Sequence, residues 1–345
     1  MQENQKQLEI CPKRRNYIQG AQQRAQDVSA TCVFCDPANL EKNYILTECP
    51  ECDVRLMLNL TPTLPLHRGR HLVVMPRSHE KDPNKIAIKQ VKAECDEILG
   101  LAHRLHSDAF SQEYFTNIGP GGGQSVPNHF HRQFKSFEKE PLSLSEMLEE
   151  AKSATITIQQ AFEQMKKKME APIEIFKADE ESLPRLDCLC CCTGGSGSIN
   201  DEKNLVVARL KHNYICLTQY PVLPGEIAVV PHRHVSSIKD LTAEEFYENM
   251  IVATALIPHL MEYANKKIRE CTGANLSTIG MGNKASEKKK QRHHLYTLVM
   301  PRTTIAATPG TLEGNSCKLD ENVPSFYKFA KKRMPAVRAR LEDKG

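Results

Sequence analysis

The stretch of residues 118–133, IGPGGGQSVPNHFHRQ, decides how the rest of the chain is interpreted. Its opening pattern, Ile-Gly-x-Gly-x-x-x-Ser, returns at residues 279–286. A pair of histidines follows in each copy, first His129 with His131 and later His293 with His294. A glycine-containing turn that precedes two histidines twice in one chain indicates an internal repeat.

The segments before the two copies match as well. Pro-x-x-x-Gly at residues 65–69 precedes the apolar strand HLVVMP and a Pro-x-x-His pattern that ends at His79. The same order recurs over residues 221–234, where the strand is EIAVVP. Apolar stripes predict a long helix at 84–106 in the first copy and at 242–269 in the second. The chain is therefore predicted to contain two copies of one strand–helix–strand domain.

Two more helices are predicted outside the repeat. Residues 143–171 have helical spacing, and Ser143 with Glu146 three positions later has the spacing of a capping box. Residues 326–341 form a basic tail that is also predicted to be helical.

Composition bounds the class of protein. The chain has 345 residues, of which 40% are hydrophobic and 26% charged, a globular composition that excludes a disordered or collagen-like protein. No apolar run reaches the ~18 residues of a membrane span, and residues 1–15 do not resemble a signal peptide. The net charge of +4 suits a polyanionic small molecule and is too weak to indicate nucleic-acid binding. Thirteen cysteines, an odd number, favour reduced thiols and a cytoplasmic location.

The histidine-containing segments resemble a known superfamily. Gly-Gln-Ser-Val at 123–126, followed by His-Phe-His-Arg-Gln at 129–133, resembles the signature of the histidine-triad proteins. The segments PRSH and PHRH resemble the strand-turn that precedes it. A tandem pair with His-x-His-x-Gln is similar to the transferase branch, which includes galactose-1-phosphate uridylyltransferase, diadenosine tetraphosphate phosphorylase and GDP-L-galactose phosphorylase. Asn128 stands between Pro127 and His129, whereas the uridylyltransferase has Pro-His-x-His-x-Gln, and this version of the motif looks closer to that of the phosphorylases.

The resemblance implies an α+β fold of two tandem histidine-triad-like domains, each an antiparallel sheet with a long helix, whose sheets could run together. The domain organisation expected from it comprises an N-terminal arm at 1–30, a catalytic domain at 31–185, a linker at 186–204, a degenerate second domain at 205–310 and a C-terminal tail at 311–345.

The resemblance also implies covalent catalysis by His131. Residues i and i+2 of a strand share a face, so His129, His131 and Gln133 are expected to look into one site. A neutral imidazole whose second nitrogen is held by a carbonyl can attack the α-phosphorus of a nucleotide. Gln133 cannot shuttle a proton, which should disfavour attack by water. Gln133 and Ser125 are assigned to the phosphoryl oxygens, and further substrate contacts are expected from Asn117, Gly121, Gly122, Gly123, Gln124 and Arg132.

The second copy is expected to have lost this chemistry, because Tyr296 falls at the position of the nucleophile and Leu298 at that of the glutamine. Residues 287–291, EKKKQ, are interpreted as a solvated loop, with phosphate contact as the alternative.

A zinc site is expected from Cys32, Cys35, His79 and His129, which supply a tetrahedral sulfur and nitrogen set that matches the ligand order of the uridylyltransferase family. The ion would brace the strand structurally, and the alternative is a pair of buried thiols. Cys49 and Cys52 form a rival pair. For residues 188–192, rich in cysteine, no matching histidines are identified, and a second metal on His234 and His294 is a weaker alternative because no Cys-x-x-Cys is assigned to them.

The function predicted is that of a nucleotidyltransferase or phosphorylase that acts on a sugar nucleotide or dinucleoside polyphosphate through a nucleotidyl-histidine. Its partners would be this nucleotide and a phosphate or phosphosugar acceptor, with no nucleic acid and no membrane, and a homodimer is left open. Two alternatives are a hydrolase of nucleotide conjugates and a non-catalytic nucleotide-binding protein.

Overall fold

The computed structural model describes most of both predicted copies. The described residues are 32, 34–35, 44–59, 66, 68–119, 122, 124, 126, 129–140, 156–173, 188, 190–191, 201–202, 204–218, 221, 225–268, 271–303 and 323–342. The predicted N-terminal arm at 1–30 lies outside them, as do Gly121, Gly123 and Ser125 of the glycine-rich turn.

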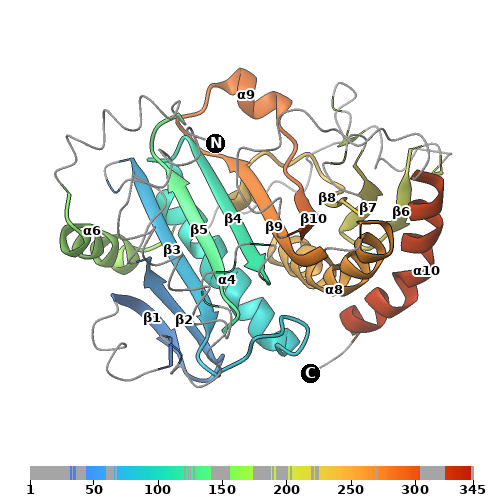
Figure 1. Cartoon of the computed structure of the whole chain (residues 1–345). Helices are drawn as coiled ribbons and strands as arrows, with labels where there is room; N and C mark the ends of the chain where they lie inside the picture. Colours follow the sequence, from blue (N-terminus) through green and yellow to red (C-terminus); the bar gives the residue numbers. More distant parts are fainter. Residues whose placement is uncertain are drawn as a thin grey trace, which may run out of the picture.

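A ten-stranded antiparallel sheet forms the centre of the molecule (Figure 1). Its strands follow the order β1-β2-β3-β5-β4-β9-β10-β8-β7-β6, so the second five strands repeat the order of the first five in reverse. The strands are β1 (Ile45–Cys49), β2 (Val54–Leu58), β3 (Gly69–Pro76), β4 (Ser111–Ile118), β5 (Arg132–Phe137), β6 (Val206–Arg209), β7 (Asn213–Leu217), β8 (Ile227–Pro231), β9 (Cys271–Met281) and β10 (Thr297–Thr303). The predicted α+β fold of two antiparallel copies is confirmed.

The two copies join along one pair of strands. β4 pairs with β9 from Ser111 opposite Met281 to Ile118 opposite Ala274. β4 and β9 are the edge strands of their five-stranded sheets, so their pairing joins the two sheets into one. We call the β4–β9 pair the seam.

The long helices of the two copies cover one face of the sheet (Figure 1). They are α4 (Ile88–His106) and α8 (Ala243–Ile268), close to the bounds predicted from their apolar stripes. The predicted helical tail is α10 (Val323–Glu342), which packs against α8. Shorter elements are α6 (Ile158–Glu170), α9 (Glu287–Arg292) and the 3-10 turn η1 (Ile238–Asp240).

Two local predictions are corrected. The helix predicted at 143–171 is not continuous: Thr157 is extended and forms a capping box with Gln160, so that α6 begins at Ile158. Residues 143–155 of this prediction, with Ser143 and Glu146, lie outside the described residues. Residues 287–291 form most of α9 rather than a loop, and Ser286 caps this helix by accepting a hydrogen bond from the Lys289 amide.

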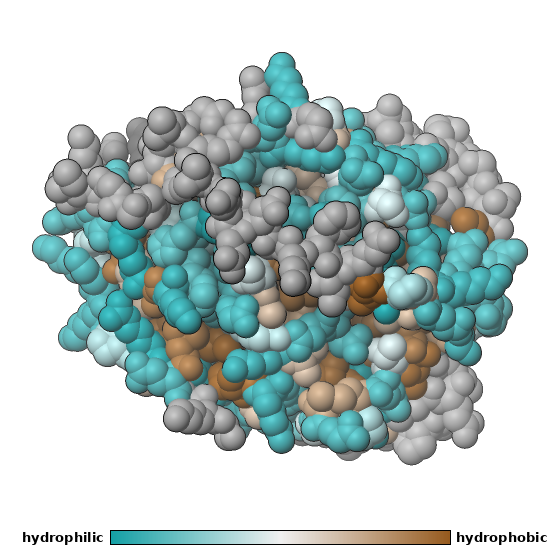
Figure 2. Space-filling model, turned by 180° about the vertical axis from the view of Figure 1, so that it is seen from behind, coloured by the Kyte–Doolittle hydropathy of each residue, from teal (hydrophilic) through white to brown (hydrophobic). Residues whose placement is uncertain are grey.

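The alternation of side chains along the strands separates the core from the site. Phe130, Arg132 and Phe134 point to the face covered by α4 and α8, where the apolar core lies. His131 and Gln133 therefore point to the opposite face, which we call the outer face. Seen from behind, the molecule is mostly hydrophilic at its surface, with smaller hydrophobic areas between polar residues (Figure 2). Among the described helices, none combines the length and apolar character that crossing a bilayer requires.

Candidate functional site

The His131 ring, immediately before β5, is held in one tautomer. Its Nδ1 lies 3.1 Å from the backbone carbonyl of His129, so the Nδ1–H donates a hydrogen bond to that oxygen. Burial lowers the pKa of the imidazole, and only 3% of the residue is exposed. A neutral ring that is protonated at Nδ1 keeps its lone pair on Nε2, which is the form needed for nucleophilic attack.

Gln133 follows on the same face and is held by a residue that sequence reasoning missed. The Nε2 of His71, on the neighbouring strand β3, lies 2.8 Å from Oε1 of Gln133 and 3.2 Å from Nδ2 of Asn59. In the tautomer with hydrogen on Nε2, the shorter contact is a hydrogen bond that the Gln133 carboxamide oxygen accepts. The amino group of the same carboxamide can then donate to a ligand. The only signal in the sequence was the position of His71 on an apolar strand, which does not distinguish a positioning residue from a core histidine.

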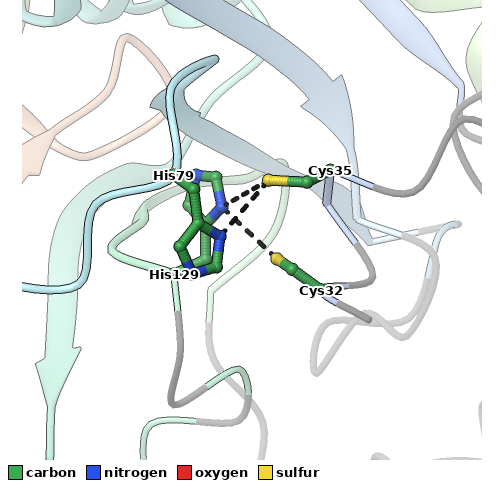
Figure 3. Close-up of side chains that lie close together, drawn as sticks. All are labelled: Cys32, Cys35, His79 and His129. Atoms are coloured by element: carbon green, nitrogen blue, oxygen red, sulfur yellow. Dashed lines mark hydrogen bonds between the residues drawn. The ribbon is translucent and has the colours of Figure 1, made fainter. Parts of the chain in front are cut away.

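The four predicted metal ligands, Cys32, Cys35, His79 and His129, converge on one point (Figure 3). The Sγ atoms of Cys32 and Cys35 each lie 3.4 Å from Nδ1 of His129, and Cys35 Sγ is also 3.4 Å from Nδ1 of His79. Zinc bonds of about 2.3 Å to sulfur and about 2.0 Å to nitrogen give sulfur–nitrogen edges of roughly 3.5 Å in a tetrahedron. The spacing of these atoms therefore fits a zinc ion.

The surroundings of this cluster also fit a cation. His129 Nε2 lies 2.9 Å from the carbonyl of Pro76, so Nε2 carries the hydrogen and Nδ1 is left to bind metal. Burial and the neighbouring Cys32 raise the pKa of the Cys35 thiol to about 11. A bound cation would lower the pKa of both thiols, because it stabilises the thiolate form.

A second cluster of the same composition occurs in the second copy. Cys188, Cys191, His234 and His294 lie with all four ligand atoms within 4.8 Å of one another. Sγ of Cys188 and of Cys191 are each 3.4 Å from Nδ1 of His294, whose Nε2 faces the Pro231 carbonyl at 3.1 Å. This arrangement repeats that of the first cluster atom for atom.

The sequence interpretation of this region was wrong in one respect. Cys188-Leu-Cys-Cys191 is itself a Cys-x-x-Cys pair, hidden within a run of four cysteines, and it supplies the partners for His234 and His294. The beginning of the segment predicted as a linker thus belongs to a buried cluster. Cys49 and Cys52, the rival pair, lie at the turn between β1 and β2, where the Cys52 amide donates to Cys49 Sγ at 3.2 Å.

The glycine-rich turn packs against the second copy. Gly119 has a φ of +67°, and a Cβ there would lie 2.3 Å from the carbonyl oxygen of Thr272. A Cβ on Gly122 would lie 2.4 Å from the carbonyl oxygen of Ala274. Only glycine allows the turn to approach β9 this closely.

Gln124 ties this turn to the histidine strand. Its Oε1 accepts from the Gly119 amide at 2.9 Å, and its Nε2 donates to the carbonyls of Val126 and His129 at 3.0 and 3.3 Å. The carboxamide that was predicted to contact substrate is thus committed to backbone groups, including the carbonyl that orients His131.

Arg132 is not part of the site that contains His131. Its side chain lies on the core face, in a buried ion pair with Glu94 at 2.8 Å, and stacks over Phe130 at 4.9 Å. The prediction that Arg132 contacts substrate is corrected, because residues i and i+1 of a strand point to opposite faces.

Asn117 lies on the outer face in line with His131. Its Oδ1 accepts a hydrogen bond of 2.7 Å from Asn275 Nδ2, across the seam. In the second copy, Tyr296 is 40% exposed and stands where the first copy has His131. His293, the other histidine of that pair, bonds through Nε2 to the Ile279 carbonyl at 2.7 Å.

Comparisons with known proteins agree with this fold. No family model matches the sequence. Two strains of Mycobacterium tuberculosis have a curated protein described as "AP-4-A phosphorylase" that is 36% identical over 118 residues, or 34% of this chain. The match spans 56% of that protein, so the chain covers about half the length of the curated relatives it matches.

Solved structures are similar over most of the chain. An ADP-glucose phosphorylase from Arabidopsis thaliana superimposes with a TM-score of 0.53 at 18% identity, covering 81% of this chain and 83% of that one. A uridylyltransferase superimposes with a TM-score of 0.56 at 18% identity, covering 89% and 91%. At this level of identity the likeness concerns the fold.

Proposed function

We propose that this chain, whose fold is that of the tandem histidine-triad transferases, is a nucleotidyltransferase or phosphorylase that works through a covalent nucleotide on His131. The observation that carries the proposal is the hydrogen bond from His131 Nδ1 to the His129 carbonyl, which leaves Nε2 as a neutral nucleophile beside Gln133. The similarity to a protein described as AP-4-A phosphorylase adds support for a nucleotide with a phosphate chain as the donor.

The reaction would proceed in two half-reactions. In the first, His131 Nε2 attacks the α-phosphorus, a nitrogen–phosphorus bond forms, and the bond to the leaving phosphate oxygen breaks with its electron pair. The Nδ1–H stays on the ring, and the His129 carbonyl stabilises the positive charge. In the second, an oxygen of phosphate or of a phosphosugar attacks the same phosphorus, and the electron pair of the nitrogen–phosphorus bond returns to Nε2. Ping-pong kinetics follow from this order.

Gln133 would hold a phosphoryl oxygen during both steps, since its carboxamide is oriented by His71. Ser125 and the glycines Gly121 and Gly123 stay predictions for phosphoryl contacts, because they lie outside the described residues.

Zinc in both clusters would act as a structural support. Cys32, Cys35, His79 and His129 would hold the first ion and Cys188, Cys191, His234 and His294 the second. A zinc ion supplies a fixed tetrahedral link between distant segments. In the first cluster this link would fix His129, whose own carbonyl orients the reactive ring.

The ten described cysteines are all free thiols, which supports the cytoplasm as the compartment. The domain boundaries and the homodimer stay predictions.

A labelling experiment tests the function. The protein is incubated with a panel of sugar nucleotides and dinucleoside polyphosphates, and its intact mass is measured. We expect an added mass equal to one nucleoside monophosphate, and its loss in His131→Ala. His293→Ala is the matched control, because His293 belongs to the second copy and to neither cluster, and it should keep the adduct.

Product analysis then separates a transferase from a hydrolase. Release of the nucleotide should require inorganic phosphate or a phosphosugar. Release at an equal rate in their absence would show a hydrolase, and binding without any adduct would show a non-catalytic nucleotide-binding protein.

A further inference from the structure

A row of polar side chains crosses the seam on the outer face. Asn117 on β4 lies opposite Asn275 on β9, and Asn275 lies opposite Met300 on β10. The His131 carbonyl accepts a hydrogen bond of 2.7 Å from Thr116, so His131 stands at the same level on the next strand. Because neighbouring strands are about 4.8 Å apart, Asn275 lies about 10 Å from the backbone of His131.

The carboxamide of Asn275 connects the glycine-rich turn to an arginine of the second copy. Its Nδ2 donates to Asn117 Oδ1 at 2.7 Å and to the Gly122 carbonyl at 2.8 Å. Its Oδ1 accepts from Nε of Arg302 at 2.6 Å. The guanidinium of Arg302 is therefore positioned along this row, next to the turn that precedes the reactive histidine.

Arg302 forms no ion pair within the part of the chain that the structure describes. Its other contact is from Nη2 to the Met300 sulfur at 3.4 Å, a weak acceptor, and no described carboxylate forms an ion pair with it. Burial lowers the pKa of this half-buried guanidinium, and Glu226 acts in the opposite direction. Other cations near the site do have acidic partners: Arg132 pairs with Glu94, and Lys135 with Glu113.

A partly buried arginine without an acidic partner gains most from an anionic ligand. Desolvation of a charge costs free energy that an opposite charge recovers. The guanidinium fork matches the oxygens of a phosphate and can bind two of them at once.

We propose that Arg302 binds the phosphate that lies beyond the α-phosphate of a nucleotide at His131. This inference rests on the proposed function and assigns part of that site to the second copy. In the first half-reaction Arg302 would stabilise the negative charge that the leaving phosphate gains as its bond to the α-phosphorus breaks. In the second, it would hold the acceptor phosphate in the same place.

Calorimetric titration of the full chain with mono- and triphosphates tests the assignment. The probes are AMP with ATP and UMP with UTP, measured on the wild type and on Arg302→Gln. We expect the substitution to weaken binding of the triphosphate by at least about tenfold, the cost of one charge-assisted contact. Binding of the monophosphate should change less than about twofold. Arg209→Gln, on the edge strand β6 and paired with Asp201, is the matched control and should change neither.

Three outcomes would overturn the assignment. An unchanged triphosphate affinity would show that Arg302 binds no phosphate. Equal weakening of monophosphate and triphosphate, reproduced by Asn275→Ala, would show that Arg302 acts only by holding Asn275 and the turn. Failure of the wild type to bind any of the four nucleotides, with no adduct in the mass measurement, would remove the proposed function together with this inference. The first two results leave the proposed function intact.

Discussion

The backbone carbonyl of His129 links the first cysteine–histidine cluster to the ring of His131. The side chain of His129 faces the two thiols through Nδ1 and the Pro76 carbonyl through Nε2. Its own carbonyl accepts hydrogen bonds from His131 Nδ1 and Gln124 Nε2. A single residue therefore contacts the two thiols through its side chain and fixes the tautomer of His131, the proposed nucleophile, through its backbone carbonyl.

At the same scale, His71→Ala should slow the reaction by releasing the Gln133 carboxamide. Loss of a hydrogen bond worth about 1.4 kcal/mol corresponds to about a tenfold lower kcat. The effect should be larger on kcat than on KM, because Gln133 is expected to act on the phosphoryl group during transfer. Steady-state kinetics with the donor found by mass measurement checks this. His71→Gln keeps a donor and should recover part of the rate, and a wild-type rate in His71→Ala would contradict the role.

The buried pair of Arg132 and Glu94 gives a prediction of stability rather than activity. Arg132→Met leaves the Glu94 carboxylate unpaired in the core, and we expect the free energy of unfolding to fall by about 3 kcal/mol or more. The double variant Arg132→Met with Glu94→Leu should recover most of this loss, because it removes both charges. Denaturant unfolding measures both variants. If Arg132→Met is as stable as the wild type but binds nucleotide more weakly, this result would support the substrate contact that was predicted from the sequence.

At the scale of elements, the periodicity of apolar residues was enough to predict a helix or strand where one face of that element is buried. The stripe at 84–106 and the alternation around His131 predicted α4 and the faces of β5, because burial imposes a spacing on apolar residues. The helix predicted as continuous from Ser143 is interrupted at Thr157, which is extended and forms a capping box with Gln160, while residues 143–155 lie outside the described part of the chain. A local pattern states which caps are available but not which one tertiary contacts select.

The two cysteine–histidine clusters predict a metal content of two zinc ions per chain. Elemental analysis of the purified protein should find two, falling to one in Cys35→Ser and to one in Cys191→Ser. We expect the first variant to lose nucleotide transfer, because its cluster contains His129. The second should retain the adduct with a lower melting temperature, because its ion only joins segments of the second copy. One ion in the wild type, or loss of adduct in Cys191→Ser alone, would contradict this division of roles.

At the scale of the whole molecule, the seam joins two similar copies into one continuous sheet. The repeat was visible in the sequence, but the sequence did not decide whether the sheets of the two copies join. The hydrogen bonds that place Asn275 and Arg302 beside the glycine-rich turn could not be predicted, since they depend on how β4 pairs with β9. No spacing along the chain records the register between strands that are about 160 residues apart. In the proposed site, the second copy therefore supplies a wall although it has Tyr296 at the position of His131.

The repeated Ile-Gly-x-Gly pattern has a structural reason at the seam that a pair of substitutions can test. A Cβ on Gly282 would lie 2.3 Å from the carbonyl oxygen of Ala109, and the Gly282 amide donates to the Phe110 carbonyl at 2.8 Å. Gly282→Ala must separate the two copies locally, and we expect it to lower the free energy of unfolding by about 1–3 kcal/mol. Gly100→Ala is the matched control. Gly100 lies within α4, and a Cβ there would be 3.6 Å from the Ile173 side chain, an ordinary van der Waals contact. Alanine favours a helix over glycine, so this variant should be as stable as the wild type or up to about 1 kcal/mol more stable. Denaturant unfolding of both variants decides the point: equal stability of the two would mean that the seam yields to an added methyl group, and that the glycine is not required for the copies to join.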